Sequence, residues 1–297
     1  SIPAIGALVP DLVEEELLPQ ANAIRGVAMT CAWMLGPLIG GFSVATWGIE
    51  VCLILDVLTF AFSALVLWTI PEIPIEREEG GNLREEVTEA WSFVKTQPWL
   101  FAGIAMFMIW HIGDSAIEIG IPFIIENNGL GAKEFGVFGA VGAAGAMIGS
   151  VIGGIRPVSK EIRGLVFYVL IGGIAWCMLM WAMPIPFLLI LVFVLLEGVL
   201  GGTLGVIWRT TMSDSVDQHL RGRVNSLDAI GSLVFIPLSP LLGGWMIEET
   251  NVLTTFSVAV SFMVITTMAG LIVPSFRRFE RVDSDLFPIE IDRSQSG

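Results

Sequence analysis

Three acidic residues and a histidine lie inside long apolar stretches of this 297-residue chain. His111, Asp114 and Glu118 are spaced i, i+3 and i+7, which places them on one face of a helix. Glu197 lies in a second apolar stretch and is followed directly by Gly198. A carboxylate at the centre of a bilayer costs about 2.5–3.5 kcal/mol on insertion scales, so each of these acids needs a physical explanation.

Proton exchange is the chemistry that such carboxyl groups support. A carboxyl group that moves from water to an apolar site binds a proton more readily, so a site that alternates between wet and dry states can take up and release protons. We expect Asp114, Glu118 and Glu197 to border a transport pathway, with at least one of them carrying a proton. His111 could relay that proton or form a hydrogen bond with Asp114. The alternatives are a purely structural polar cluster, or a Glu118 that stays in water near the outer surface.

Membrane-spanning helices are the elements that would position these residues. Hydrophobic residues make up 54% of the chain, charged residues 15%, and the mean hydropathy is +0.79. A bilayer core about 30 Å thick needs about 20 apolar residues of helix. The composition and the net charge of −14 exclude a soluble enzyme, a disulfide-stapled secreted domain and a nucleic-acid-binding protein. We expect an all-α polytopic membrane protein with eight spans, at about 23–47, 49–70, 99–125, 135–155, 164–183, 185–207, 224–247 and 253–275.

Basic residues indicate how these spans are oriented. When the loops are assigned alternately to two sides, 14 of the 15 Lys and Arg residues fall on the side that holds both chain ends, and only Lys133 falls on the other. The positive-inside rule then places both ends in the cytoplasm, in a multi-pass protein of the plasma or inner membrane. Six tryptophans near predicted span ends fit interfacial belts: Trp47, Trp68, Trp99, Trp181, Trp208 and Trp245.

The segment 71–98 is the longest polar interruption between spans. Asn82 followed by Glu85 resembles a capping box, and apolar residues then recur at helical spacing. We expect a short amphipathic helix on the inner membrane face that links two bundles. The apolar positions are Leu83, Val87, Trp91 and Val94.

No motif for a cofactor, a metal or an enzymatic reaction occurs in the sequence. Cys31, Cys52 and Cys177 lie in apolar stretches without metal-binding spacing, and His111 and His219 are far apart in the chain. Walker A, HExxH and GxSxG motifs are absent. We therefore expect neither an ATP-driven pump nor an enzyme, and no cofactor.

An internal repeat relates two parts of the chain. Residues 11–41 align without gaps with 214–244, with nine identities in 31 positions. Both copies lead from a predicted cytoplasmic loop into a span, and such parallel repeats are one of the transporter architectures. Arg25 and Asp228 occupy equivalent positions in the two copies. They either snorkel to the membrane interface or take part in a cytoplasmic gate.

Four stretches carry a resemblance to a known family. The first contains Ala23, Ala32 and Gly36-Pro37-Leu38-Ile39-Gly40-Gly41. It resembles the antiporter motif of helix five in major facilitator superfamily transporters, with Ala23 and Ala32 where that motif has glycines. The other three are similar to the bacterial drug and siderophore exporter branch: Leu220–Val224, which contains Arg221 and Arg223, Ala7–Val13 and Leu55–Phe60. The loop 153–160 lacks the acid of the superfamily's loop motif.

The resemblance implies a chain that begins at the end of helix four and lacks the first three to four helices, so that its spans are helices five to twelve. It implies a remnant of the N-terminal bundle (1–70), a central cytoplasmic loop (71–98), a C-terminal six-helix bundle (99–276) and an acidic tail (277–297). It further implies that helices seven and ten line a central cavity, and that helices five and eight face each other. Two glycine faces would then meet: Gly36, Gly40 and Gly41 with Gly142, Gly145, Gly149 and Gly153.

We therefore expect secondary active, proton-coupled efflux of small amphipathic molecules by alternating access, with Phe107, Trp110 and Trp176 facing the cavity. The expected partners are a small-molecule substrate, protons, the lipid bilayer and the missing N-terminal helices. A metabolite uptake carrier, or a truncated scaffold or assembly partner that does not transport, remain as alternatives. The candidate cytoplasmic gate comprises Arg25, Asp228, Arg221 and Arg223.

Overall fold

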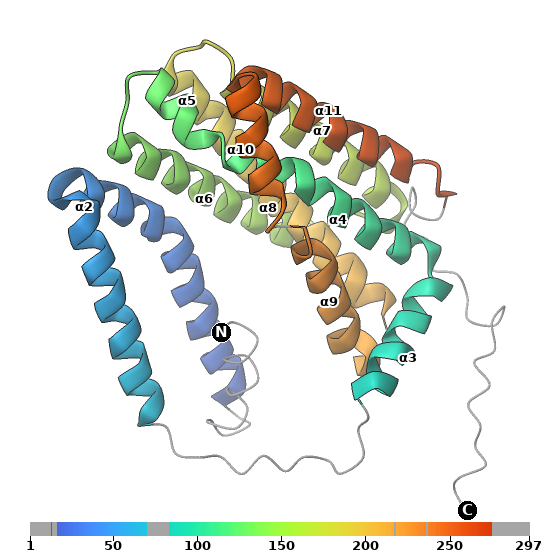
Figure 1. The fold of residues 1–297 in the computed structure, drawn as a ribbon. Helices are drawn as coiled ribbons and strands as arrows, with labels where there is room; N and C mark the ends of the chain where they lie inside the picture. The colour runs from blue at the N-terminus through green and yellow to red at the C-terminus, as the bar shows by residue number, and fades with distance from the viewer. Residues whose placement is uncertain (1–12, 14–16, 70–82, 217, 236, 275–297) are drawn as a thin grey trace, which may run out of the picture.

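All regular elements of the computed structural model, which describes residues 13, 17–69, 83–216, 218–235 and 237–274, are helices (Figure 1). The predicted all-α class is therefore confirmed. In chain order the helices are α2 (Leu18–Trp68), α3 (Leu83–Thr96), α4 (Pro98–Glu118), α5 (Ile121–Asn127), α6 (Ala132–Ile155), the short η2 (Lys160–Ile162), α7 (Arg163–Trp181), α8 (Phe187–Ser215), α9 (Gln218–Leu233), α10 (Ser239–Glu249) and α11 (Val252–Gly270).

Six helices of the described residues are long and apolar enough to cross a membrane, against the eight predicted spans. The first difference lies in α2, which holds the predicted spans 23–47 and 49–70. Gly48 interrupts this helix with φ 81° and ψ 164°, a backbone conformation that glycine adopts readily because it has no Cβ. The two arms of α2 run in opposite directions on either side of this bend (Figure 1), so the boundary between the two predicted spans lies where the sequence places it.

The second difference lies at the predicted span 224–247, which is divided between α9 and α10. The prediction of one continuous span is wrong here, because Pro237 and Pro240 both remove backbone donors and α10 starts only at Ser239. The aligned copy of the repeat has Pro37 but carries Met34 opposite Pro237, and its helix continues. The two copies therefore share sequence but differ in helix continuity.

The tightest helix pair in the structure is α6 with α8, and glycine makes it possible. A Cβ added to Gly145, Gly149 or Gly198 would collide with backbone atoms of the opposite helix. Thr203 adds a hydrogen bond across the pair, from its hydroxyl to the Gly149 carbonyl at 3.0 Å. Small residues allow such close approach between membrane helices.

The predicted partner of this glycine face is therefore wrong. The face formed by Gly142, Gly145, Gly149 and Gly153 packs on α8 and not on α2. The first arm of α2 does pack on α6, but through Gly41, where a Cβ would meet Ala132 and Gly136. A Cβ at Gly36 or Gly40 would meet no atom within 4 Å.

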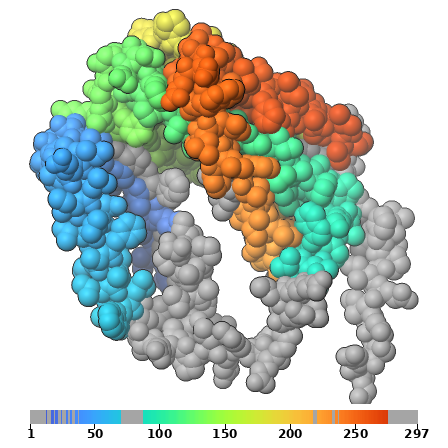
Figure 2. All heavy atoms as spheres, in the orientation of Figure 1, coloured from blue at the N-terminus to red at the C-terminus, as the bar shows by residue number. Residues whose placement is uncertain are grey.

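The second arm of α2 is almost free of contacts within the described part of the chain. An apolar 18-residue stretch within Leu38–Trp68 has no buried residue, whereas 22–50% of the corresponding stretch is buried in each of the other five candidate spans. Figure 2 shows this arm, in light blue, standing apart from α9 and α3. Asp56 lies on this arm and is exposed.

The predicted amphipathic helix is confirmed as α3, but its buried face is shifted. Ala90, Phe93 and Val94 are buried, whereas Val87 and Trp91 remain 48% and 40% exposed. Arg223 of α9 forms an ion pair with Glu89 on the outer side of the helix. The capping box at Asn82 and the tail at 277–297 lie outside the described residues.

A buried arginine fixes the loop that connects α6 with α7. The Arg163 guanidinium lies 2.9 Å from the Asp214 carboxylate of α8 and donates to the carbonyl of Val158 at 3.3 Å. It also reaches the hydroxyl of Thr211 at 3.4 Å. The loop 153–160 itself lacks the acid of the superfamily's motif, and Asp214 supplies a carboxylate from a neighbouring helix.

We expect Arg163→Met to lower the stability of the folded protein. The side chains of Arg163 and Asp214 are 10% and 35% exposed, so the pair is partly buried. Removing an exposed ion pair costs about 0–1 kcal/mol of folding free energy, and breaking a buried one costs about 3–5 kcal/mol. We expect the loss here to fall between these two ranges. Thermal unfolding of Arg163→Met, Asp214→Asn and the double variant in detergent measures the coupling. Fully additive single losses would contradict a stabilising pair.

Candidate functional site

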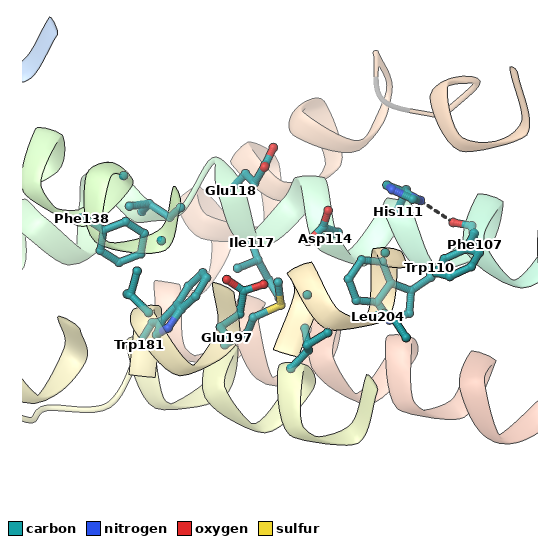
Figure 3. A pocket seen from close by; sticks show the side chains of 18 of the residues that line it. Phe107, Trp110, His111, Asp114, Ile117, Glu118, Phe138, Trp181, Glu197 and Leu204 are labelled. Atoms are coloured by element: carbon teal, nitrogen blue, oxygen red, sulfur yellow. Dashed lines mark hydrogen bonds between the residues drawn. The ribbon is translucent and has the colours of Figure 1, made fainter. Parts of the chain in front are cut away.

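A cavity of about 490 Å³ lies among α4, α6, α7, α8 and α9 (Figure 3). All four polar residues that the sequence singles out inside apolar segments line it: His111, Asp114 and Glu118 from α4, and Glu197 from α8. Asp228 of α9 lines it as well. The structure thus brings together residues that are far apart in the chain.

Helical spacing explains how two helices turn their functional residues into this cavity. On α4, Phe107, His111, Asp114 and Glu118 follow one another at intervals of three or four residues. On α8 the same rule applies over three turns, and the cavity-facing residues are Glu197, Gly201, Leu204, Gly205 and Trp208. Each helix therefore contributes one narrow face, and the charge is confined to it.

The acids of the cavity are close enough to repel one another. Asp114 and Glu197 are half-buried and Glu118 is exposed, and the charges of Glu118 and Glu197 both act on Asp114. The Glu197 carboxylate lies over Gly201, since a Cβ there would be 3.4 Å from the Oε1 atom. None of the described residues that line the cavity is Lys or Arg. Protons or a bound cation are the species that can offset this charge.

His111 is held by its own helix. Its Nδ1 atom donates to the carbonyl oxygen of Phe107 at 2.7 Å (dashed in Figure 3). In the neutral ring this bond leaves Nε2 as an acceptor that can receive a proton. The two roles expected of His111, a proton relay and a hydrogen bond to Asp114, stay predictions.

Asp228 is bound to the aromatic wall of the cavity. Trp208 Nε1 donates to its Oδ2 atom at 3.1 Å, and the Trp208 ring packs edge-on against Phe107, with centroids 5.0 Å apart. The side chain of Arg25, the residue equivalent to Asp228 in the repeat, lies outside the described residues.

The candidate gate residues whose side chains the structure describes lie at two places. Arg221 lines a separate cavity of about 200 Å³ together with Arg209 and Asn225, and Trp208 and Asp228 also border it. Arg221 donates to the carbonyl oxygen of Ser213 at 2.8 Å. Arg223 instead pairs with Glu89 of α3. The gate stays a prediction.

The antiporter-like motif lies on the first arm of α2, outside the cavity lining. Ala32, Gly36 and Gly40 are exposed, and Gly41 is buried against α6. The side chains of Ala23 and Pro37 lie outside the described residues. The motif and the acidic cavity are thus separate features of this structure.

Sequence reasoning missed several aromatic residues of the site. Trp181 and Trp208, predicted as interfacial anchors, are 5% and 8% exposed and line the cavity, and Trp99 is fully buried. Trp176, predicted to face the cavity, is 54% exposed and packs against Phe193. Helical spacing carries the missing signal, because Trp208 lies eleven residues after the acid on α8 and therefore on the same face.

Phe107 and Trp110 do line the cavity, as the sequence predicts. Phe138 of α6 joins them and stacks edge-on against Trp181, with ring centroids 5.1 Å apart. The cavity is therefore acidic at its centre and aromatic along its walls. Such a surface suits a ligand with both a charge and apolar groups.

Comparison with known proteins places this geometry in context. The profile of the Major Facilitator Superfamily matches residues 1–231. The enterobactin exporter EntS of Shigella boydii serotype 4 (strain Sb227) is 25% identical over 288 residues, which cover 94% of this chain and 67% of that protein. The enterobactin exporter EntS of Escherichia coli O127:H6 (strain E2348/69 / EPEC) is 25% identical over 293 residues, with the same coverage of 94% and 67%. No solved structure gives a significant match.

Proposed function

This chain belongs to the Major Facilitator Superfamily, and from that premise we propose that it exports small amphipathic molecules in exchange for protons, by alternating access. It is a multi-pass membrane transporter. The observation that carries the proposal is the cavity in which Asp114, Glu118 and Glu197 meet without a lining Lys or Arg among the described residues. The names of the similar exporters support the outward direction.

Protonation gives these acids a role in the transport cycle. When the cavity closes and water leaves, a charged carboxylate there becomes costly, and a protonated one is neutral. When the cavity opens to the side with fewer protons, the proton leaves and the charge returns. His111, with Nδ1 bound to the Phe107 carbonyl, can pass a proton through its second nitrogen. Both chain ends lie in the cytoplasm in this proposal, as the basic residues predict.

The exposed second arm of α2 favours a further part of the proposal. The chain matches about two thirds of the length of the similar exporters, with 67% covered, and an apolar 18-residue stretch within Leu38–Trp68 has no buried residue. We propose that a complete carrier also contains helices equivalent to the unmatched third, packed on this arm. The same observation supports the alternative of an assembly partner, whereas nothing in the cavity favours metabolite uptake.

Reconstitution tests the proposal directly. We expect the full chain in proteoliposomes to move amphipathic fluorescent dyes against their gradient when a pH gradient is imposed, and to stop when a protonophore removes that gradient. Protein-free liposomes provide the baseline. Dye movement that persists unchanged with the protonophore would remove proton coupling, and no movement of any cationic, neutral or anionic dye would remove transport by this chain.

A further inference from the structure

We propose that the smaller cavity between α8 and α9 binds a phosphate group that retains one proton, either inorganic phosphate or a phosphate monoester. The inference goes beyond the proposed function, since it concerns a second site and does not depend on transport. It is drawn from the donors that surround this cavity, from its size and from a buried acceptor at its edge.

Positive charge is the first argument. Arg209 of α8 and Arg221 of α9 line this cavity of about 200 Å³, and Asp228 is the one acid among its described lining residues. Arg163 and Arg223 each have a carboxylate partner, whereas Arg209 forms no ion pair or hydrogen bond with another described residue. The guanidinium group is planar and offers several donors, which suits it to the oxygens of a phosphate. An anion is therefore the ligand that this charge favours.

Arg221 is held in place and has one donor left over. Its Nη2 atom donates to the carbonyl oxygens of Ser213 at 2.8 Å and Val216 at 3.4 Å, so the guanidinium joins the start of α9 to the end of α8. Its Nε atom is buried and has no hydrogen-bond partner among the described residues. A buried donor without a partner is unfavourable, and an anion whose oxygen accepts from it removes this penalty.

Neutral donors complete the set. Ser213 and Asn225 also line the cavity, and neither side chain forms a hydrogen bond with another described residue. A hydroxyl and an amide can each donate to an oxyanion. A water molecule takes up about 30 Å³ of the liquid, so a cavity of about 200 Å³ has room for a small tetrahedral ion. Donors from both helices can then reach the same ion.

Asp228 is the reason why the bound group should retain a proton. Its Oδ2 atom accepts from Trp208 Nε1 at 3.1 Å, and its Oδ1 atom is buried without a hydrogen-bond partner among the described residues. An oxyanion without a proton would set an oxygen lone pair against this acceptor and be repelled. A phosphate with a P–O–H group can donate to Oδ1 while its other oxygens accept from the two arginines. The site should therefore prefer phosphate to sulfate, which carries no proton near neutral pH.

Two ions of the same shape test the inference on the purified full chain in detergent. Equilibrium dialysis at constant ionic strength should show saturable binding of radiolabelled phosphate, and at least about tenfold weaker binding of radiolabelled sulfate. Phosphate should also raise the unfolding temperature more than sulfate does, because a ligand of the folded state stabilises it, whereas both ions act alike on protein surfaces in general. No saturable phosphate binding, or equal binding of the two ions, would overturn the inference.

Variants of the arginines locate the binding. Arg209→Gln should weaken phosphate binding at least about tenfold, because it removes a charge from the site. Arg221→Lys keeps a charge but removes the Nε donor, and should weaken binding by several-fold. Arg223→Gln is the control, since it removes the same charge from α9 outside the cavity and should leave binding unchanged. Size-exclusion profiles show which variants fold, and unchanged binding in a folded Arg209→Gln variant would overturn the site.

Asp228→Asn tests the retained proton through a gain of binding that a merely structural residue would not give. Asparagine keeps the size of the side chain and can still accept from Trp208, and its amide donates where the acid only accepts. Sulfate binding should therefore strengthen by several-fold, and the preference for phosphate should fall by the same factor. An unchanged preference in the folded variant would overturn the retained proton.

Nanodiscs separate the two sources of the phosphate group. The second pKa of a phosphate monoester is about 6, so at about pH 6 half of such groups keep their proton. We compare phosphate binding in discs of phosphatidylcholine with added phosphatidic acid, a monoester lipid, or with added phosphatidylglycerol, a diester without a P–O–H group. Displacement of phosphate by phosphatidic acid alone would identify a lipid head group as the ligand, and displacement by neither lipid would identify a soluble phosphate. Equal displacement by both lipids would overturn the inference.

Discussion

Gly149→Leu is expected to leave no folded, monodisperse protein. Gly149 lies where α6 and α8 come closest, and a Cβ there would be 2.7 Å from the carbonyl carbon of Val199 and 2.9 Å from its Cα. These atoms belong to the α8 backbone and cannot rotate away. The cost should exceed the about 1–3 kcal/mol that is typical of overpacked cores, because the whole helix must move.

A moved α8 would also carry other contacts with it. Gly198 and Gly202 of α8 also lie too close to the backbone of Ala146 on α6 to accept a Cβ, so the pair cannot open at one point only. Size-exclusion chromatography and thermal unfolding in detergent measure the effect. The cavity is lined by the same two helices, so any surviving protein should also show weaker transport driven by a pH gradient.

Gly154 on the same helix offers a matched control. A Cβ at Gly154 would meet no atom within 4 Å, so Gly154→Leu should fold normally. Substituting alanine at the same two positions gives a finer comparison. Gly154→Ala should be neutral or should stabilise the protein by up to about 1 kcal/mol, because alanine has the higher helix propensity. Gly149→Ala should be destabilising. A normal elution profile for Gly149→Leu would show that the close approach of α6 and α8 is not needed for folding.

The sequence predicts the helices well and their contacts less well. Long apolar runs define α6, α7 and α11 to within about five residues, since a bilayer requires about 20 such residues per span, whereas α8 continues to Ser215, past the predicted end at 207. The glycines of α6 mark a close contact in the sequence, but the spacing alone does not say with which helix. The partner turned out to be α8, because Gly198 and Gly202 provide the complementary small surface.

The acidic residues of the site could be predicted, and most of its aromatic wall could not. An acid inside an apolar run carries a cost that is visible in the sequence. A tryptophan in an apolar run has no such cost, and Trp181 and Trp208 lie near the ends of the predicted spans, where either an interface or a cavity would suit them. The break between α9 and α10 was missed for a related reason, since a proline in a membrane helix permits either a continuous bend or an interruption.

Glu197→Gln is expected to abolish accumulation driven by a pH gradient. Glutamine keeps the size and a hydrogen-bonding end, and fits over Gly201 as the acid does, but it can neither take up a proton nor carry a charge. Accumulation should fall at least about tenfold, while exchange of dye down its own gradient continues. Proteoliposome assays with and without the imposed pH gradient separate the two processes.

The loss of proton coupling when each of the other acids is replaced should depend on how buried that acid is. Asp114 is half-buried between Glu118 and His111 on the cavity face of α4, so Asp114→Asn should impair coupling about as strongly as Glu197→Gln. Glu118 is exposed, and Glu118→Gln should have a smaller effect because water already stabilises its charge. Asp56→Asn, outside the cavity, is the control and should couple normally. If Glu197→Gln and Asp114→Asn both retain full coupling, the transported protons do not pass through these carboxyl groups. The unfavourable free energy of an acid in an apolar segment must then be explained by substrate binding alone.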